Sequence, residues 1–241
     1  LKPLVFYKYR VCAFTTTDTS DFSDIATAVI LIPIEDVDGN QYETVAIGDQ
    51  IWMSENLRTK HYRNGDSIKN IPKDDDWVSS TLGAYCGENR YGWKPEYGTL
   101  YNWYAVSDIR NIAPAGWHVP TDADWNKLEH ELGITNETID EFGVRGWNSV
   151  GSKLAGTQFW RPGALTESKE FGSSGFNAVP AGYRNSYSGT FYEIGSTCIY
   201  YTSTENNESN NNSVIIVQWI ITVWIFKEIL VARTEHIQCG V

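Results

Sequence analysis

Alternating hydrophobic and polar positions predict that most of this chain folds as short β-strands. The clearest such segments lie at residues 6–14, 25–32, 42–47 and 50–53. A polar segment, 15–23, separates the first two, and Asp38-Gly39 is a hairpin-turn dipeptide that precedes the third. After Gly151 the chain consists mainly of short apolar runs between Gly, Asn and Ser turns. A β-rich fold with many loops is therefore expected.

One segment has clear helical periodicity. Its apolar residues recur at helical spacing, at Trp125, Leu128 and Leu132. Thr121 is the expected N-cap, acidic residues follow in the first turn, and Gly133 ends the helix. A shorter helix is expected over 137–142. The predicted fold class is thus α+β, with one or two helices and a loop-rich second half.

The longest apolar run lies at residues 214–226 and resumes at 229–232 after Lys227-Glu228. It is shorter than the ~20 residues that a transmembrane helix needs, so no membrane insertion is expected. Continuous Val and Ile runs are typical of strands buried on both faces. An exposed apolar surface of this size would instead mark an interaction site. Both interpretations stay open.

Composition and charge narrow the class of protein. The 241 residues fit one large domain, or one domain and a fragment, and 10 Trp, 14 Tyr and 9 Phe suffice to build a core. The 30 acidic and 19 basic side chains give a formal net charge of −11. This charge argues against nucleic acid and anionic membrane surfaces as partners. Abundant Trp, Tyr, Gly and Asn are typical of extracellular binding modules.

A search for catalytic and metal-binding patterns finds none with the required spacing. The four histidines, which form no close ligand pair, are His61, His118, His130 and His236. The four cysteines, which include no Cys-x-x-Cys pair, are Cys12, Cys86, Cys198 and Cys239. Cys198 lacks a recognisable catalytic companion, and segment 36–40 places Gly39 too early for an EF-hand. We expect no enzyme activity, metal or cofactor, a structural role for His118, and a solvated acidic loop at 74–76.

Long, ordered motifs over residues 34–241 resemble a known family. They include Ile47-Gly48-Asp49-Gln50-Ile51-Trp52-Met53, Tyr97-Gly98-x-Leu100-Tyr101-Asn102-Trp103, Gly116-Trp117-His118-Val119-Pro120-Thr121 and Tyr201-x-Ser203-Thr204-Glu205. In these motifs the chain is similar to the Fibrobacter succinogenes major paralogous domain, a family of surface and phage-associated proteins. The segment Tyr7-x-Tyr9-Arg10-Val11-x-Ala13 resembles the last two strands of a fibronectin type III domain. The expected units are a fibronectin-like hairpin at 1–32 and the major domain at 33–241.

The family resemblance implies a C-type-lectin-like fold, in the branch that contains the formylglycine-generating enzyme. Such a fold has a small twisted antiparallel sheet and long loops. The enzyme branch uses a pair of active-site cysteines that has no evident counterpart here, so a non-enzymatic protein is expected. The family commonly has a cysteine after Ala-Tyr, here Cys86, and one near the C-terminus, here Cys239. A Cys86–Cys239 disulfide and an oxidising compartment are thereby implied.

The resemblance also singles out residues 214–237, where the family is usually polar. In the C-type-lectin fold this region is where diversity-generating retroelements concentrate variation, and randomised Asn codons yield residues such as Ile and Phe. The expected binding face comprises Ile215, Val217, Trp219, Ile221, Val223, Trp224, Phe226, Ile229, Val231 and Arg233. Its expected rim comprises Trp160, Tyr183, Arg184 and Tyr201. The scaffold tryptophans, expected in the core, are Trp52, Trp103, Trp117 and Trp125.

The expected function is ligand binding by a non-enzymatic, extracellular domain displayed on a bacterial surface or a phage particle. The expected partner is a protein or a glycan on a cell surface, and the same face would also suit a homo-oligomer contact. Two alternatives use this face differently: a structural or adhesion module with a fixed subunit contact, and a carbohydrate-binding module. Neither a nucleic-acid partner nor a cofactor is expected.

Overall fold

The computed structural model describes residues 1–87, 90–134, 150–206, 213–220 and 237–238, and from residue 205 onward it describes the backbone only. The described helices are short: α1 (Asp74–Val78), the 3₁₀ turn η1 (Pro95–Tyr97), α2 (Trp103–Val106), α3 (Asp122–Glu131) and α5 (Val150–Leu154). The strands of the first half are β1 (Phe6–Tyr9), β2 (Ala26–Val29), β3 (Ile34–Glu35), β4 (Gln41–Tyr42), β5 (Thr44–Ile47), β6 (Gln50–Met53), β7 (Lys69–Asn70), β8 (Ala84–Cys86) and β9 (Leu100–Tyr101). Those of the second half are β10 (Tyr183–Asn185), β11 (Phe191–Tyr192), β12 (Thr197–Asn206), β13 (Ser213–Ile220) and β14 (Ile237–Gln238).

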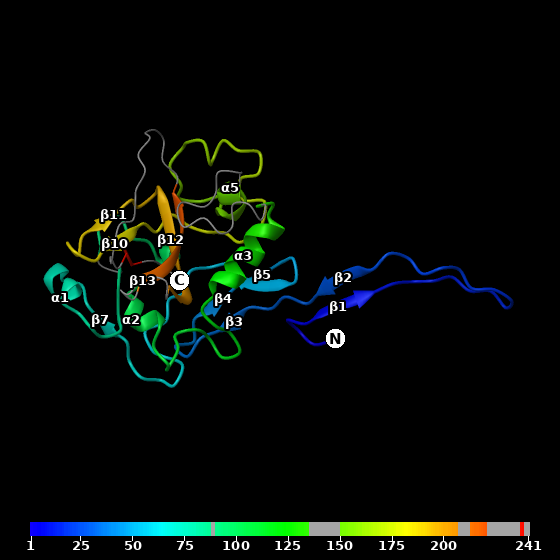
Figure 1. Ribbon diagram of the computed structural model, residues 1–241, viewed down its shortest axis with the longest axis horizontal. Helices are drawn as coiled ribbons and strands as arrows, with labels where there is room; N and C mark the ends of the chain where they lie inside the picture. The colour runs from blue at the N-terminus through cyan, green and yellow to red at the C-terminus, as the bar shows by residue number, and fades with distance from the viewer. Residues whose placement is uncertain (88–89, 135–149, 207–212, 221–236, 239–241) are drawn as a thin grey trace.

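These strands form small sheets of two or three strands each. Their pairings are antiparallel except for β7 with β8. The short helices lie around the sheets (Figure 1). The α+β class is therefore confirmed, and the turn at Asp38-Gly39 is confirmed too. There Gly39 has a φ of +79°, and the Asp36 carboxylate accepts hydrogen bonds from the backbone N–H groups of Asp38 and Asn40.

Strand β12 runs through the middle of the main body (Figure 1). Its consecutive residues Ile199, Tyr200 and Tyr201 are all buried, so both faces of the strand are covered. On one edge it pairs with β13, with Cys198 opposite Trp219 and Tyr201 opposite Ile216. Residues 214–220 of the apolar run thus belong to a strand. In the part of the chain that the structure describes, no helix has the length and apolar character to cross a bilayer.

Two large clusters of buried side chains meet at β12. The first contains the rings of Tyr42, Tyr101, Trp103 and Tyr201. The second contains Trp52, Trp125, Phe176 and Tyr200. Because Tyr200 and Tyr201 point to opposite faces of the strand, β12 joins the two clusters. The core positions of Trp52, Trp103 and Trp125 are confirmed, whereas Trp117 is only partly buried.

The predicted helix is confirmed as α3. Thr121 is its N-cap, and a capping box joins Thr121 to Asp124 in both directions. The side chains that α3 buries include Trp125 and Leu128, which were predicted from helical spacing. The second predicted helix, 137–142, lies outside the described residues.

The loop predicted at 74–76 is wrong, because these residues form the first turn of α1, whereas their predicted exposure to solvent is confirmed. Three aspartates stand where the helix dipole favours negative charge. Trp77 follows them and is 2% exposed, so the turn is held against the core by a buried indole. The run of three aspartates in the sequence is therefore the first turn of a helix.

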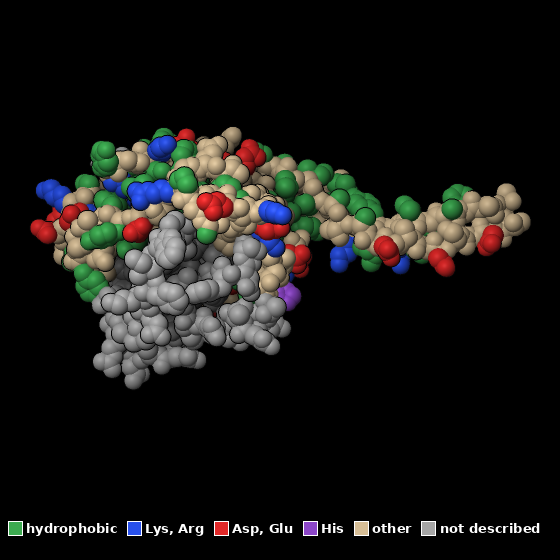
Figure 2. Space-filling view, turned by 90° about the horizontal axis from the view of Figure 1, so that it is seen from above, with side chains coloured by type: hydrophobic (Ala, Val, Ile, Leu, Met, Phe, Trp, Pro, Cys, Tyr) green, Lys and Arg blue, Asp and Glu red, His purple; other side chains and the backbone are tan. Residues whose placement is uncertain are grey.

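The N-terminal hairpin, β1 paired with β2, projects away from the main body (Figure 1). Its regular ladder is shorter than predicted and ends at Tyr9 opposite Ala26. Beyond that point serine hydroxyls replace backbone acceptors: the N–H of Val11 donates to Ser23 Oγ at 3.0 Å. Hydrophobic side chains are spread along the projecting hairpin (Figure 2), and Phe14 is 82% exposed.

Candidate functional site at the hairpin base

The predicted binding face, 214–237, lies largely outside the described residues. Within it the structure describes only the backbone of β13 and β14. Strand β14 pairs with β10, with Arg184 opposite Gln238. The exposure of the predicted contact residues therefore stays a prediction. Those that belong to β13 are Ile215, Val217 and Trp219. Those outside the described residues are Ile221, Val223, Trp224, Phe226, Ile229, Val231 and Arg233.

The predicted rim needs correction, because Arg184 has no exposed surface. Its guanidinium donates to the carbonyl oxygens of Ile71 and Gly189, both at 2.6 Å, and to Asp74 Oδ1 at 3.0 Å. The indole of Trp77 packs over the guanidinium carbon, 4.4 Å from the ring centroid. Arg184 therefore joins three separate chain segments inside the fold, and it is a structural residue.

Tyr201 is likewise buried, with 1% exposure, and its ring packs 5.7 Å from that of Trp103. It is a core residue and not part of a rim. Tyr183 is half-buried and stacks on Tyr192 with ring centroids 5.7 Å apart. Trp160 is also half-buried, and its indole N–H donates to the carbonyl of Ala178 at 3.1 Å.

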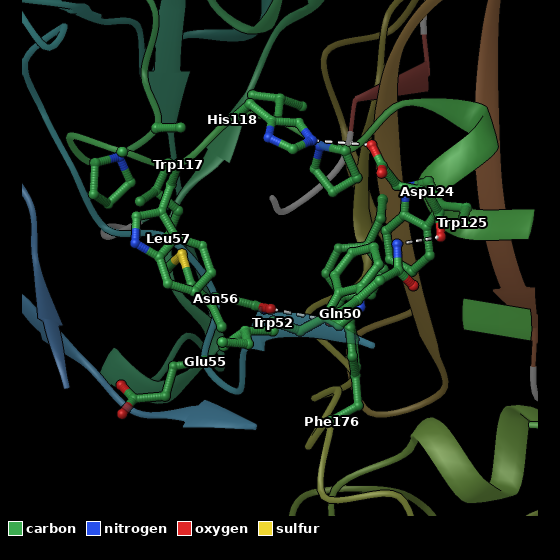
Figure 3. A pocket seen from close by; sticks show the side chains of 18 of the residues that line it. Gln50, Trp52, Glu55, Asn56, Leu57, Trp117, His118, Asp124, Trp125 and Phe176 are labelled. Carbon is green, nitrogen blue, oxygen red and sulfur yellow. Dashed lines mark hydrogen bonds and ion pairs between the residues drawn. The ribbon is translucent and has the colours of Figure 1, made fainter. Parts of the chain in front are cut away.

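The structure instead forms a pocket of about 480 Å³ where the N-terminal hairpin meets the main body. Its walls come from the start of β1, from β6 and the residues after it, from the loop before α3, and from β12. Leu4 and Phe6 are the contributions of the hairpin. Figure 3 shows Trp117 on one side of the space, with Gln50 and Trp52 facing it from the other.

The loop that carries Trp117 is fixed by a single arginine. Arg63 donates to three carbonyl oxygens of this loop: those of Ala113 at 2.9 Å, Pro114 at 3.0 Å and Trp117 at 2.6 Å. Three donors from one planar group leave the loop backbone little freedom. The backbone of this loop is therefore fixed, and the half-buried Trp117 ring packs against the cluster that contains Tyr101 and Trp103 as one wall of the pocket.

His118 and Asp124 form the upper edge of the pocket (Figure 3). His118 Nε2 lies 3.0 Å from Asp124 Oδ2, and the imidazole is 66% exposed. The same carboxylate oxygen accepts from the backbone N–H of Thr121 at 2.8 Å and from its hydroxyl at 2.6 Å. Burial works to raise the pKa of Asp124, but these hydrogen bonds and the imidazole outweigh it and lower the pKa. Asp124 thus orients His118, whose ring is exposed, and the structural role expected for this histidine stays a prediction.

The floor of the pocket is a cluster of aromatic rings. Trp52 packs on Trp125 at 5.0 Å and on Phe176 at 5.7 Å between ring centroids, and Tyr200 lies 5.5 Å from Trp125. The Tyr200 hydroxyl donates to Asn56 Oδ1 at 3.0 Å, which fixes that amide. These tilted ring contacts make a rigid base beneath the opening.

Gln50 connects the β5–β6 hairpin to α3. Its amide donates to the carbonyl of Asp124 at 3.2 Å. Its Oε1 and the neighbouring Trp52 Nε1 are buried and have no hydrogen-bond partner among the described residues. Buried polar atoms are rarely left unpaired in native proteins, so these two mark a place where a small rearrangement would gain hydrogen bonds.

The charged groups around the pocket are already paired. Asp49 at the β5–β6 turn contacts Lys127 at 2.5 Å, and Glu55 contacts Arg58 at 2.6 Å. Asp124 faces His118, as described above. Among the described lining residues there is no Lys or Arg. The pocket therefore presents apolar walls and polar groups, and its acidic groups have cationic or imidazole partners.

The cysteine thiols of the core are not suited to nucleophilic chemistry. Cys198 is buried on β12, and burial raises its pKa to about 12. Burial also raises the pKa of Cys86 to about 11, against the opposing influence of the nearby Arg184 guanidinium. The predicted disulfide partner Cys239 lies outside the described residues, so the Cys86–Cys239 bond stays a prediction.

Sequence reasoning missed this pocket because its residues were assigned to the scaffold. The motif containing Trp117 and His118 is predicted to be structural. Leu4 and Phe6 belong to the segment predicted to be a fibronectin-like hairpin. One signal was available: Trp117 and His118 follow directly on Gly116, in a segment without helical or strand periodicity. Aromatic residues in such a loop often serve binding.

Comparisons with known proteins identify the family of this chain. The model of the Fibrobacter succinogenes major domain matches residues 45–236. No curated protein and no solved structure matches the chain. The matched region contains β6, the Trp117 loop and β12, which form most of the pocket, and it leaves out Leu4 and Phe6. The chain belongs to the Fibrobacter succinogenes major domain family.

Proposed function

We propose that this protein is a non-catalytic ligand-binding domain, displayed outside the cell on a bacterial surface or a phage particle. The observation that carries the proposal is the preformed pocket at the hairpin base. Its volume of about 480 Å³ lies in the range of small-molecule sites, which are mostly apolar with a few fixed polar groups. The Asn56 and Gln50 amides are held by hydrogen bonds to other parts of the chain, and the Trp117 ring packs against the core, so binding would order few side chains.

A C-type-lectin-like fold suits this proposal. Small antiparallel sheets, one longer helix and long connecting segments are compatible with it. Folds of this kind carry binding residues on loops held by a rigid scaffold. The loop from Ala113 to Pro120, fixed by Arg63, is an example here.

A thermal-shift screen with a library of small neutral compounds tests the proposal. A ligand that binds only the native state raises the melting temperature as its concentration rises. We expect at least one compound to stabilise the native protein and to lose that effect in Trp117→Ala. Tyr91→Ala, which removes a fully exposed ring outside the pocket, should keep it. A library without a single stabilising compound would contradict ligand binding at this site.

The segment 214–237 is a second candidate surface, for a protein or glycan partner or for a second copy of the chain. The apolar run continues past β13, and its Ile- and Val-rich composition suits diversification of Asn codons by a retroelement. A structural or adhesion module with a fixed contact, and a carbohydrate-binding module, are the alternatives for this surface.

Replacing Ile220, Ile225 and Phe226 together by Ser tests whether that surface is exposed. An exposed surface predicts a nearly unchanged melting temperature, because no buried apolar contact is lost. A collapse of stability would instead assign these side chains to the core, at roughly 2 kcal/mol or more for each. Diversification has its own test: a near-repeat with Asn codons next to a reverse-transcriptase gene should accompany the coding sequence.

A further inference from the structure

The side chains that line the pocket at the hairpin base narrow the chemical class of ligand that it can bind. This inference rests on the proposed binding function. We propose that it binds a neutral saccharide of one or two rings, with Leu4 and Phe6 of the N-terminal hairpin as part of the binding wall. The ligand would thus contact both the hairpin and the family domain.

Charge is the first argument for a neutral ligand. Three carboxylates line the pocket, those of Asp49, Glu55 and Asp124. Each has a partner within 3.0 Å, in Lys127, Arg58 and His118 respectively. An anionic ligand would meet these carboxylates without any lining Lys or Arg to offset them, among the residues described. A cationic ligand would have to compete with the existing partners.

The pocket combines an aromatic wall with fixed polar groups, and this combination suits a sugar ring. Trp117 is half-buried, and its ring forms one side of the space (Figure 3). The C–H face of a sugar ring packs on such an indole, while its hydroxyl groups need donors and acceptors at the edges. Polar groups at the edge of the pocket include the Gln50 amide, which donates to the Asp124 carbonyl at 3.2 Å, and His118, which faces the Asp124 carboxylate.

His118 strengthens this assignment. Its Nε2 faces Asp124, so the ring is oriented, and Nδ1 has no hydrogen-bond partner among the residues that the structure describes. A purely apolar ligand would cover these polar groups without pairing them, which costs free energy. A hydroxyl group both donates and accepts, and it therefore suits a pocket whose lining includes both an amide and an imidazole.

The hairpin completes the wall. Leu4 packs against the buried cluster that contains Tyr101 and Trp103, and its N–H donates to the Ile30 carbonyl at 2.8 Å. Phe6 follows on β1, opposite Val29. Both side chains line the pocket, although the family match begins only at residue 45. Sites between two structural units are common, because each unit supplies one wall.

Isothermal titration of the full chain with a panel of neutral sugars tests the proposal. The panel contains glucose, galactose, mannose, N-acetylglucosamine, cellobiose, maltose and lactose, each raised to tens of millimolar, because single small sites of this kind bind weakly. We expect at least one to bind, and glucuronate, the anionic counterpart of glucose, to bind more weakly than glucose. No heat of binding from any member of the panel would overturn the saccharide assignment.

Two substitutions locate the site. Phe6→Ser and Trp117→Ala should each weaken binding by about ten-fold or more. Phe14→Ser is the matched control, because it removes a phenyl ring from the same hairpin at an exposed position outside the pocket. Trp117→Phe keeps an aromatic wall and should retain most of the affinity, which separates loss of the ring from loss of folding.

The outcomes distinguish this inference from the proposed function. Sugar binding that survives both Phe6→Ser and Trp117→Ala would place the site elsewhere and overturn the inference. If no sugar binds but another neutral compound stabilises the native protein and not Trp117→Ala, the ligand class is wrong while the binding function stands. If no sugar binds and no neutral compound stabilises the native protein, the saccharide assignment and the proposed binding function are both wrong.

Discussion

At the residue scale, the most informative side chain is Arg184. It was predicted to be a surface contact, yet it has no exposed surface and donates hydrogen bonds to Gly189, Ile71, Pro72 and Asp74. Sequence alone shows a polar residue in a strand near the expected binding face, and it does not show which carbonyl groups converge on that residue. Acceptors of this kind offset the free-energy cost of burying the Arg184 guanidinium.

Replacing Arg184 by Lys should destabilise the protein strongly. A lysine cannot make the planar set of hydrogen bonds, so buried carbonyl oxygens would lose their donors, at a cost of about 3 kcal/mol or more in the free energy of unfolding. Urea unfolding measures this. Arg110→Lys is the control, because Arg110 pairs with Asp108 and Asp66 at the surface and should change stability little. Equal effects of the two substitutions would refute the structural role of Arg184.

Asp124 predicts a dependence of stability on pH. Its pKa is lowered in the folded protein, so its carboxylate contributes stability above the unfolded value, about 3.9, and this contribution is lost as the pH falls through the folded pKa. Asp124→Asn should therefore be less stable than the native protein at pH 7. The difference should shrink below about pH 4. Urea midpoints of both proteins at several pH values measure it, and a difference independent of pH would contradict the assignment.

At the scale of the element, α3 shows what local sequence can predict. Its N-cap, its buried positions and its end were all readable, because capping and helical periodicity depend on neighbouring residues. Thr121→Ala should cost about 1 kcal/mol of stability by removing the cap. Ser107→Ala is the control, because it removes a hydroxyl group at the C-cap of α2 and leaves the helix N-caps unchanged. Equal losses from the two changes would argue against a special role for the capping box.

The strands show which features cannot be predicted from neighbouring residues alone. Strand β6 was predicted with the observed bounds, and β1 was predicted too long because the serine hydroxyls that interrupt its ladder come from the other strand. The pairing of β12 with β13 and of β10 with β14 joins segments whose alignment depends on the whole fold. The pocket was missed for the same reason, since its walls come from five distant parts of the chain.

At the scale of the whole molecule, the cysteines offer a test of how the C-terminal segment closes the fold. Gln238 lies opposite Arg184, and the Arg184 guanidinium is close enough to Cys86 to influence its pKa. Cys239 follows Gln238 directly in the sequence. The predicted Cys86–Cys239 disulfide should leave two free thiols, Cys12 and Cys198, in unreduced, denatured protein. A thiol titration that finds four would contradict the disulfide.

The whole molecule consists of a family domain with a projecting hairpin, and its candidate site lies where the two meet. Composition and motifs predicted the α+β class and the family, because these depend on patterns along the chain. They did not predict that Leu4 and Trp117 line the same pocket, since this follows only from how the hairpin base packs on the core.

The indole N–H signal of Trp117 in a ¹H–¹⁵N correlation NMR spectrum tests directly whether a ligand binds in the pocket at the hairpin base. Trp117→Phe identifies the signal by its disappearance. During titration with a compound that stabilises the protein, we expect this signal to shift in a saturable manner. The signal of Trp93, which donates to the Gly98 carbonyl outside the pocket, should stay in place. Saturable binding that leaves the Trp117 signal unmoved would contradict the claim that the pocket at the hairpin base is the binding site.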